Sequence, residues 1–322
     1  MFSDSEKLFN PFYDNESFLL ICHENPDPDA IGSASALGLF LKKLGKNVIY
    51  YAQKPFRTNL RYIDELRFFS DTNPNPNDYD VLVYLDCSDS GYAYVPKNLE
   101  EKPSIVIDHH LTNTGFGTWN FVKTVSATGE LVYELIKLFE SKLGKQFLDS
   151  EIAISLFTSI SGDTGSFQFS NVTKETHEIV CDLYNFVSDF SPYSHILHRE
   201  TTFDKLKLRT KAIESLELVN SGKIAFVTLD YETIQKFTEN EPISDSISNI
   251  GTDLRGCIVA ATFKEFAPST YKVSLRSNSS DADVSKFAVK KGGGGHARAA
   301  GFSSDEPLSN LKDEICRFFK YI

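Results

Sequence analysis

The sequence SFLLICHENPDPDA, residues 17–30, joins an apolar run to a polar loop that opens a helical pattern. The run at residues 17–23 is short and ends in polar residues, which is typical of a strand buried in a parallel sheet. Apolar residues then recur at helical spacing from Ala30 to Leu44, and Gly45 supplies a C-terminal stop. We therefore predict a strand, a loop and a helix in direct succession.

The same alternation continues through the first half of the chain. Three more short runs, rich in β-branched and aromatic residues, predict strands at residues 47–51, 81–85 and 105–107. Strands that alternate with helices indicate a parallel sheet with right-handed crossovers. Ligands of such sheets bind beyond the carboxyl ends of the strands, so the residues that follow each strand are the first candidates for a site.

The pattern becomes mainly helical after about residue 129, and residues 193–219 have the periodicity of one long, charged, amphipathic helix. After Gly222 both strand and helix patterns return. Strands are predicted at residues 223–229, 258–263 and 271–276, and helices at residues 282–289 and 308–319. We predict an α/β protein with a first domain at residues 1–190, a helical linker at 191–220 and a smaller α/β domain at 221–322.

Composition restricts the class of partner. The chain has 322 residues with 33 Lys+Arg and 44 Asp+Glu, so its formal net charge is −11. That charge disfavours binding to long nucleic acid, because such affinity comes from cationic side chains that neutralise phosphates. We expect no membrane span, since no apolar run approaches the ~20 residues that cross a bilayer. We expect no signal peptide, because residues 1–15 contain three acidic side chains and no basic start followed by an apolar run. Five scattered cysteines without a Cys-x-x-Cys pair indicate reduced thiols and a cytoplasmic location.

Four short motifs bring carboxylates and imidazoles together. Three of them follow predicted strands and one ends a predicted helix. Because the strands are parallel, we expect their polar ends to meet at one edge of the sheet. The side chains concerned are His23, Asp27, Asp29, Asp86, Asp108, His109, His110 and Asp163.

So many carboxylates cannot share a cleft as bare anions, because neighbouring like charges raise one another's pKa. Divalent cations resolve this conflict. Oxygen and imidazole ligands without thiolates favour Mn²⁺ over structural Zn²⁺, with Mg²⁺ or Co²⁺ as substitutes. Two cations roughly 3.5–4 Å apart, bridged by a carboxylate and a hydroxide, would activate the nucleophile and clamp a phosphoryl oxygen.

Each motif also has a purely structural explanation. Asp27 or Asp29 could serve only as an N-cap of the helix that follows. Asp86 and Asp163 could be turn or cap residues. The three polar residues 108–110 directly follow a buried strand and have no evident packing role, and the conjunction of all four motifs favours a metal site.

The four motifs and their order resemble those of the DHH phosphoesterase superfamily. They are His-x-x-x-Asp-x-Asp-Ala, a strand-end Asp, Asp-His-His and Gly-Asp-Thr-Gly. The sequence GGGHARAAG, residues 293–301, resembles the Gly-Gly-Gly-His-x-x-Ala-Ala-Gly signature of the DHH-associated C-terminal domain. Residues 273–277 and 284–288 resemble segments that precede this signature. The resemblance covers nearly the whole chain and implies an active site in a cleft between the two domains.

The resemblance also implies a role for each residue of the four motifs. The implied ligands are His23 and Asp27 for one cation, Asp29, His109 and Asp163 for the other, and Asp86 for both. Asp108 would orient His109 and raise its basicity. His110 would face the phosphate as a hydrogen-bond donor or general acid.

The glycine run before His296 can bring backbone N–H groups close to a phosphate. A flexible linker is the alternative for such a run, and the signature that follows disfavours it. By resemblance, we expect this segment to hold the non-scissile phosphate or nucleoside of a short substrate. The predicted contact residues are Arg276, Gly293, Gly294, Gly295, His296 and Arg298.

The function that the resemblance implies is that of a Mn²⁺-dependent phosphodiesterase with a two-metal hydroxide mechanism. Cyclic di-AMP, the dinucleotide pApA and very short oligoribonucleotides are the expected substrates, each cut to mononucleotides such as AMP. A 3′-phosphoadenosine 5′-phosphate phosphatase and a non-catalytic nucleotide sensor are the alternatives. An inorganic pyrophosphatase fits the C-terminal signature poorly, and a processive DNA exonuclease would need a longer chain with a basic, aromatic channel. Relatives in the superfamily suggest a homodimer.

Overall fold

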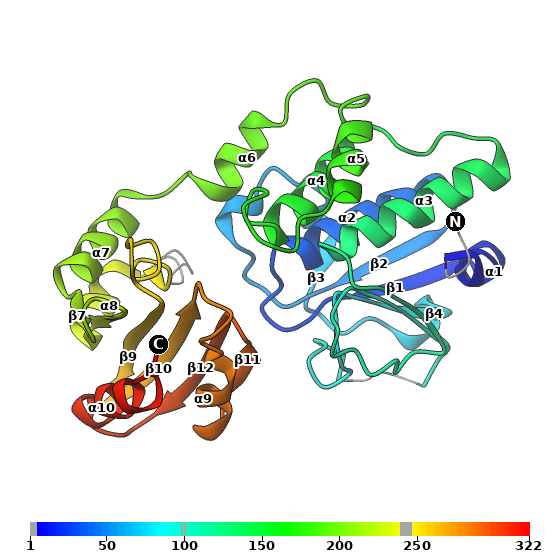
Figure 1. Cartoon of the computed structure of the whole chain (residues 1–322). Helices are drawn as coiled ribbons and strands as arrows, with labels where there is room; N and C mark the ends of the chain where they lie inside the picture. The colour runs from blue at the N-terminus through cyan, green and yellow to red at the C-terminus, as the bar shows by residue number, and fades with distance from the viewer. Residues whose placement is uncertain (1–4, 98, 100, 239–246) are drawn as a thin grey trace. The chain divides into compact units, whose positions relative to one another are not determined.

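Six parallel strands form the first sheet of the computed structural model (Figure 1). Their order across the sheet is β3-β2-β1-β4-β5-β6, so the direction of strand addition reverses between β1 and β4. The strands are β1 Ser17–Ile21, β2 Asn47–Tyr51, β3 Phe69–Ser70, β4 Val81–Leu85, β5 Ser104–Asp108 and β6 Trp119–Val122. Such a reversal places a crevice at the carboxyl ends of the two central strands.

The structure describes residues 5–97, 99, 101–238 and 247–322. The chain divides into two compact units, Met1–Glu200 and Thr201–Ile322. The predicted α/β class is confirmed, with a parallel sheet in the first unit and a second sheet in the C-terminal unit. Within the described ranges no helix is both long enough and apolar enough to cross a membrane.

The main core of the first unit lies on one face of its sheet, where three long helices pack. Residues of β1 and β4 are almost all buried, because helices cover one face and loop residues such as Tyr79 and Ala93 cover the other. The helices of this unit are α1 Phe9–Asp14, α2 Pro28–Lys43, α3 Thr128–Leu143, α4 Ser150–Asp163, α5 Lys174–Leu183 and α6 Ser191–His198. Short 3₁₀ turns lie at Ser5–Leu8, Thr58–Leu60, Asp64–Phe68 and Pro76–Asp78.

The prediction of one continuous helix at residues 193–219 is wrong. The helix α6 ends at His198, and α7 begins at Phe203 after Thr202, whose hydroxyl accepts a hydrogen bond from the backbone N–H of Lys205. Residues 217–219 form the strand β7, which pairs with its neighbour β8. A capping threonine breaks the helix here, although the charge and apolar periodicity continues across the break.

The second sheet is mixed, with the order β11-β12-β10-β9-β8-β7. Only the β8–β9 pair among its described pairs is parallel, and the others are antiparallel. Helices α9 and α10 pack on one face, and α7 and α8 pack on the other. The elements are α7 Phe203–Glu214, β7 Glu217–Val219, β8 Ile224–Leu229, α8 Tyr231–Thr238, β9 Val259–Ala267, β10 Thr270–Ser277, α9 Val284–Lys290, β11 Gly294–His296, β12 Ala299–Ser304 and α10 Leu308–Phe318.

The close approach of α2 and α4 in the first unit depends on a glycine. A Cβ atom on Gly32 would lie 2.6 Å from the carbonyl oxygen of Ser155 and 2.7 Å from the backbone nitrogen of Ser159. Both neighbours are backbone atoms of α4, which cannot swing aside as a flexible side chain would. The helix pair can therefore keep its spacing only while residue 32 has no side chain.

We predict that Gly32→Ala lowers the free energy of unfolding by about 1–3 kcal/mol, because the added methyl group overpacks the α2–α4 contact. Urea unfolding at constant temperature measures the change. Ser35→Ala on the same helix is the matched control. Its hydroxyl is buried without a hydrogen-bond partner among the described residues, so its loss should be neutral or stabilising. A wild-type unfolding midpoint for Gly32→Ala would contradict this account of the packing.

Candidate active site

The reversal in strand order brings together two polar residues from the two central strands. His23 follows β1 and Asp86 follows β4, and the His23 Nε2 atom lies 3.7 Å from an Asp86 carboxylate oxygen. Asp86 has a φ of 58°, a left-handed conformation that ends the strand sharply. Its backbone N–H still donates to the carbonyl of Ile107 on β5, at 3.0 Å. Asp86 therefore turns out of the sheet at the edge where ligands of such folds bind.

Asp27 caps the helix α2. Its Oδ1 atom accepts hydrogen bonds from the backbone N–H groups of Asp29 and Ala30, at 2.9 and 3.0 Å. The same oxygen lies 3.8 Å from the Nε2 atom of His23. The capping role considered from the sequence is thus correct for Asp27, and it fixes the carboxylate beside His23.

Asp29 caps a different helix from the one on which it lies. Its carboxylate accepts hydrogen bonds from the N–H groups of Thr128 and Gly129, at 2.8 and 3.3 Å, at the first turn of α3. The N-cap residue of α3, Ala127, has no side-chain acceptor, so Asp29 takes its place. The Ser159 hydroxyl of α4 donates a further bond to Asp29, at 2.5 Å. This carboxylate is therefore held by α3 and α4 at once, and the positive end of the α3 dipole favours its charge.

Asp163 at the end of α4 completes this side of the site. A Cβ atom on the preceding Gly162 would lie 2.6 Å from the Cβ atom of Pro28, so glycine lets the end of α4 lie against the start of α2. The Asp163 carboxylate lies 3.6 Å from His109 Nε2, and the side-chain amide of Asn171 donates to its backbone carbonyl at 3.1 Å.

The Asp-His-His motif divides its contacts differently from the prediction. Asp108 pairs with His110, whose Nδ1 atom lies 2.7 Å from the carboxylate, and not with His109. The side-chain amide of Asn113 donates a second bond to Asp108, at 2.6 Å. The Nδ1 atom of His109 instead faces the carbonyl oxygen of Val125, at 3.1 Å. The ring of His109 is thereby oriented by backbone, because the carboxylate of Asp108 is already committed to its other neighbours.

The predicted metal ligands, together with His110, gather into groups that could hold cations. The groups are His23, Asp27 and Asp86; Asp29, His109 and Asp163; and Asp86, His109 and His110, each with ligand atoms within 4.8 Å of one another. Asp86 belongs to two of these groups and is only 3% exposed. The donors are carboxylate oxygens and imidazole nitrogens without a thiolate, which fits hard or borderline divalent cations. The assignment of each residue to a particular cation stays a prediction.

Crowding and burial raise the pKa of several of these carboxyl groups. Burial first, and then the charges of Asp29 and Asp27, hold the pKa of Asp86 well above its ordinary value. Burial and the charge of Asp29 raise the pKa of Asp163 to about 7, although His109 opposes the shift. Burial likewise raises the pKa of Asp29. Bound cations would replace the missing countercharge, and this cluster therefore fits a metal site by its own electrostatics.

Burial acts on the imidazoles in the opposite sense, but neighbouring carboxylates outweigh it. Burial alone lowers the pKa of His23, but the hydrogen bond and charge of Asp27 raise it overall. Burial also lowers the pKa of His109, and the charges of Asp29 and Asp163 reverse the shift. Each imidazole is therefore held in place by negative charge on its neighbours.

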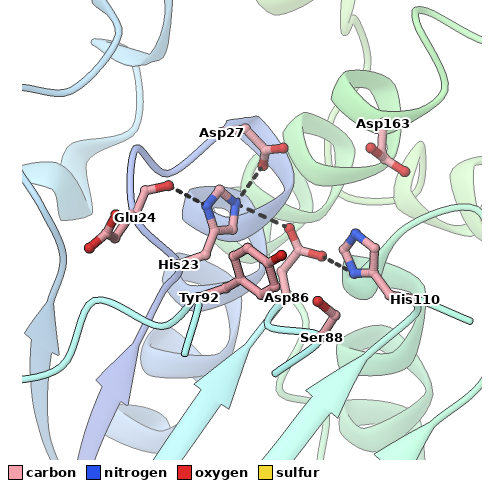
Figure 2. Close-up of a pocket in the computed structure, with 8 residues that line it drawn as sticks. All are labelled: His23, Glu24, Asp27, Asp86, Ser88, Tyr92, His110 and Asp163. Atoms are coloured by element: carbon pink, nitrogen blue, oxygen red, sulfur yellow. Dashed lines mark hydrogen bonds and ion pairs between the residues drawn. The ribbon is translucent and has the colours of Figure 1, made fainter. Parts of the chain in front are cut away.

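These side chains surround a polar pocket of about 280 Å³, shown in Figure 2. Three of its lining residues, Glu24, Ser88 and Tyr92, were not predicted as site residues. The position of Ser88, two residues after Asp86, could have indicated it. Nothing in the sequence distinguishes Tyr92 from other loop tyrosines. The pocket is lined by His23, Glu24, Asp27, Asp86, Ser88, Tyr92, His110 and Asp163.

Four of the six predicted substrate residues of the C-terminal unit lie on the strands β10 and β11, which β12 separates, and Gly293 and Arg298 lie just outside these strands. Residues 294–296, predicted as part of a loop, form the edge strand β11, which pairs with β12. His296 is opposite Ala299, and Ala299 is opposite Arg276 on β10. Cross-strand partners share a face of a sheet, so Arg276 and His296 lie in one row with a small alanine between them. The Arg276 Nε atom donates to the side-chain oxygen of Asn249, at 3.2 Å.

Comparison with known proteins finds a family and relatives that align along most of this chain. The model of the DHH family, N-terminal domain, matches residues 17–160. The bifunctional oligoribonuclease and PAP phosphatase NrnA of Thermus thermophilus is 31% identical over 284 residues, which cover 87% of this chain and 81% of that protein. The protein of the same name from Bacillus subtilis is 27% identical over 94% of this chain and 95% of its own. The crystal structure of an exopolyphosphatase-related protein from Bacteroides fragilis shares the fold, with a TM-score of 0.84, 20% identity and coverage of 98% of this chain and 95% of that chain.

We predict that the metal-free protein loses stability as pH rises from 5 to 8. A raised pKa means that the folded protein keeps a proton that the unfolded chain has already released, so folding weakens with rising pH. For Asp163 the window runs from its ordinary pKa of 3.8 to about 7, and the raised pKa values of His23 and His109 act in the same direction. The lowered pKa values of Asp27 and Asp108 act only below this window.

Thermal unfolding in the presence of a chelator measures this pH dependence. Asp163→Asn should flatten it, and excess Mn²⁺ should reverse the loss at pH 8 because cations take the place of the protons. A thermal midpoint of the chelated protein that is constant or rises between pH 5 and 8 would show that the cluster is not strained by its charges.

Proposed function

This chain belongs to the DHH family and is a phosphoesterase hydrolase, and on that premise we propose that it hydrolyses very short oligoribonucleotides, including pApA, to mononucleotides. One observation carries the proposal. Two groups of carboxylates and imidazoles share the buried Asp86 at the reversal point of a parallel sheet, beside a pocket of about 280 Å³. Ligand pockets usually occupy about 300–1,000 Å³. A pocket slightly below that range suits one phosphate and its sugar.

We propose that His23, Asp27 and Asp86 hold one divalent cation and that Asp29, His109, Asp163 and Asp86 hold a second. When bound, two Mn²⁺ ions would lower the pKa of water to supply the nucleophile and neutralise charge on the phosphoryl oxygens. Mg²⁺ or Co²⁺ would substitute, since the ligand types suit these ions as well. The residues of the chain orient these ligands through the helix caps of Asp27 and Asp29 and the backbone contact of His109.

His110 is the residue that we propose as proton donor to the leaving oxygen. Its Nδ1 atom is committed to Asp108, 2.7 Å away, and Asp108 is in turn held by Asn113. A carboxylate at Nδ1 orients the ring and leaves Nε2 as the nitrogen that can donate a proton, as in a catalytic triad. His110 also lines the pocket, which Asp108 does not. Asp108 is therefore a positioning residue for His110.

The C-terminal unit is proposed to hold the part of the substrate that does not react. Arg276 and His296 lie in one row across β10, β12 and β11, and the side chain between them is small. Two groups that can carry positive charge, separated by an alanine, suit an anion such as a second phosphate. The exposed backbone of Gly294 and Gly295 on the edge strand β11 and the exposed side chain of Arg298 belong to the same proposal.

A second substrate is favoured by the relatives. Two NrnA proteins that align along most of this chain are named for PAP phosphatase as well as oligoribonuclease activity. We propose 3′-phosphoadenosine 5′-phosphate as a monoester substrate of the same site, and cyclic di-AMP as a further diester. A non-catalytic sensor is disfavoured, because a protein that only binds nucleotides has no need of a complete set of clustered ligands. All five cysteines are unpaired, which agrees with a proposed location in the cytoplasm.

We predict that the protein, assayed with excess Mn²⁺, releases AMP from at least one of four compounds. The compounds are pApA, a short oligoribonucleotide, 3′-phosphoadenosine 5′-phosphate and cyclic di-AMP. Chromatography of the products measures turnover. Asp86→Asn should lower the turnover rate by more than about 100-fold, because it removes the ligand that both proposed cations share. Loss of a residue that only supports a metal ligand costs about 10- to 100-fold. The exposed Asp14→Asn at the opposite edge of the sheet is the control. Tight binding of cyclic di-AMP without hydrolysis of any of the four compounds would favour the sensor.

We predict separately that His296→Ala weakens substrate capture and leaves the metal site intact. Loss of one charge-assisted hydrogen bond should raise KM for pApA by about 10- to 100-fold. Titration with Mn²⁺ should give the wild-type affinity, and Lys290→Ala on α9 serves as the control. Wild-type KM and kcat values for His296→Ala would remove the C-terminal signature from the substrate site.

A further inference from the structure

One of the eight residues around the acidic pocket has a large apolar surface. Tyr92 lines the pocket together with the proposed ligands His23, Asp27 and Asp86, and its ring is drawn among them in Figure 2. We propose that this ring stacks on the nucleobase next to the reacting phosphate and so makes the site selective for nucleotides over other phosphoesters. The inference rests on the proposed function, because it assumes a nucleotide substrate.

The backbone of Tyr92 is tied to the segment that carries His23. The carbonyl of Tyr92 accepts a hydrogen bond from the backbone N–H of Glu24, at 3.0 Å, and Ala93 forms an antiparallel bridge with His23. The backbone N–H of Tyr94 donates to the carbonyl of Cys22, at 2.9 Å. The loop after β4 thus pairs with the loop after β1. This pairing fixes the backbone of Tyr92 relative to His23, a proposed metal ligand.

The neighbouring segment rigidifies the other side of the same loop. Asp89 accepts a hydrogen bond from the N–H of Gly91 at 2.8 Å, and its backbone carbonyl accepts one from the N–H of Tyr92 at 3.2 Å. The backbone N–H of Thr114, just beyond the Asp-His-His motif, donates to the carbonyl of Ser88 at 3.1 Å. The loop that carries Tyr92 is therefore hydrogen-bonded to the segments that follow β1, β4 and β5.

The ring of Tyr92 is exposed, whereas the ring of Tyr94 packs against another aromatic side chain. Tyr92 is 69% exposed, and among the described residues its hydroxyl makes no hydrogen bond. Tyr94 by contrast stacks on Tyr51, with ring centroids 5.2 Å apart and an angle of 11° between the ring planes. A fixed backbone with an exposed ring is the arrangement that base-stacking platforms use in proteins that bind single-stranded nucleic acids.

Stacking would also supply what the charges of the pocket do not. Carboxylates and cations recognise the phosphate, which all phosphoesters share, and they do not contact a base. Every nucleobase has a π-face, so a stacking ring distinguishes the presence of a base and tolerates any of the four. Because Tyr92 lines the same small pocket as Asp86, the base that it contacts belongs to the nucleoside adjoining the reacting phosphate.

The test compares the full-length protein and its Tyr92→Ala variant on pApA and on two abasic analogues, each lacking one of the two bases. With Mn²⁺ present, Tyr92→Ala should lower kcat/KM for pApA by about 10- to 100-fold. The same variant should match the wild type on the analogue that lacks the stacked base. Tyr92→Phe should keep activity within about twofold, because stacking needs the ring and not the hydroxyl. Tyr13→Ala, which removes a partly exposed ring at the amino end of the sheet, is the matched control.

Each pattern of results separates the inference from the function on which it rests. If Tyr92→Ala slows pApA and both abasic analogues equally, the ring serves the fold or contacts another protein surface, and the inference is wrong. Unchanged kcat/KM on pApA would also overturn it while leaving the phosphodiesterase activity in place. If the wild type hydrolyses neither pApA nor its analogues, the proposed function fails first and the inference with it. If the inference is right, thermal unfolding and Mn²⁺ titration of Tyr92→Ala match the wild type, and a lowered thermal midpoint would instead assign the ring a role in the fold.

Discussion

The burial of several carboxylates at one edge of a parallel sheet is the constraint on which the rest of this structure depends. Asp29 is 1% exposed and Asp86 is 3% exposed, and their charges act on each other and on Asp163. Without countercharge such a cluster raises the pKa of its own members and weakens the fold that contains it. The imidazoles of His23 and His109 offset part of this charge, and divalent cations would offset the remainder. The stability of the fold and the proposed chemistry therefore both require positive charge at this site.

The surrounding helices hold these carboxylates with hydrogen bonds that also cap helix ends. Asp27 caps α2, and Asp29 caps α3 from a neighbouring helix while it accepts a bond from Ser159 of α4. Gly32 allows α2 and α4 to approach closely enough for the last of these bonds. A carboxylate that closes a helix end is positioned by the backbone of that helix, so its orientation does not depend on flexible side chains. The capping and metal-binding interpretations of these aspartates are consequently compatible.

The charge of the whole chain and the charge of the site have different consequences. A formal charge of −11 disfavours long nucleic acid, whereas local cations would attract a single phosphate strongly. The proposed substrates are small for this reason, and their recognition is divided among three kinds of contact. Metal ligands would bind the reacting phosphate, Tyr92 would bind an adjoining base, and the Arg276–His296 row would bind a further anion.

Local patterns were sufficient to predict much of this fold and most of the candidate site. Short apolar runs ending in polar residues predicted four of the six parallel strands, and missed β3 and β6, which are too short to show a pattern of their own. Since parallel strands share one carboxyl edge, residues as distant as His23 and His110 could be assigned to one cluster from the sequence. The break between α6 and α7 escaped prediction, because one capping threonine interrupts a periodicity that continues on both sides.

Only the tertiary structure decided which group each polar side chain contacts. Asp108 contacts His110 instead of His109, and the Nδ1 atom of His109 faces the carbonyl oxygen of Val125 from a separate segment. The glycine run became an edge strand because β12 was available to pair with it. The sequence alone determined the residue types and the sheet edge at which they meet, since strand and helix patterns are local. Pairing, burial and the exposure of the Tyr92 ring depend on segments far apart in the chain, so these features were decided when the chain folded.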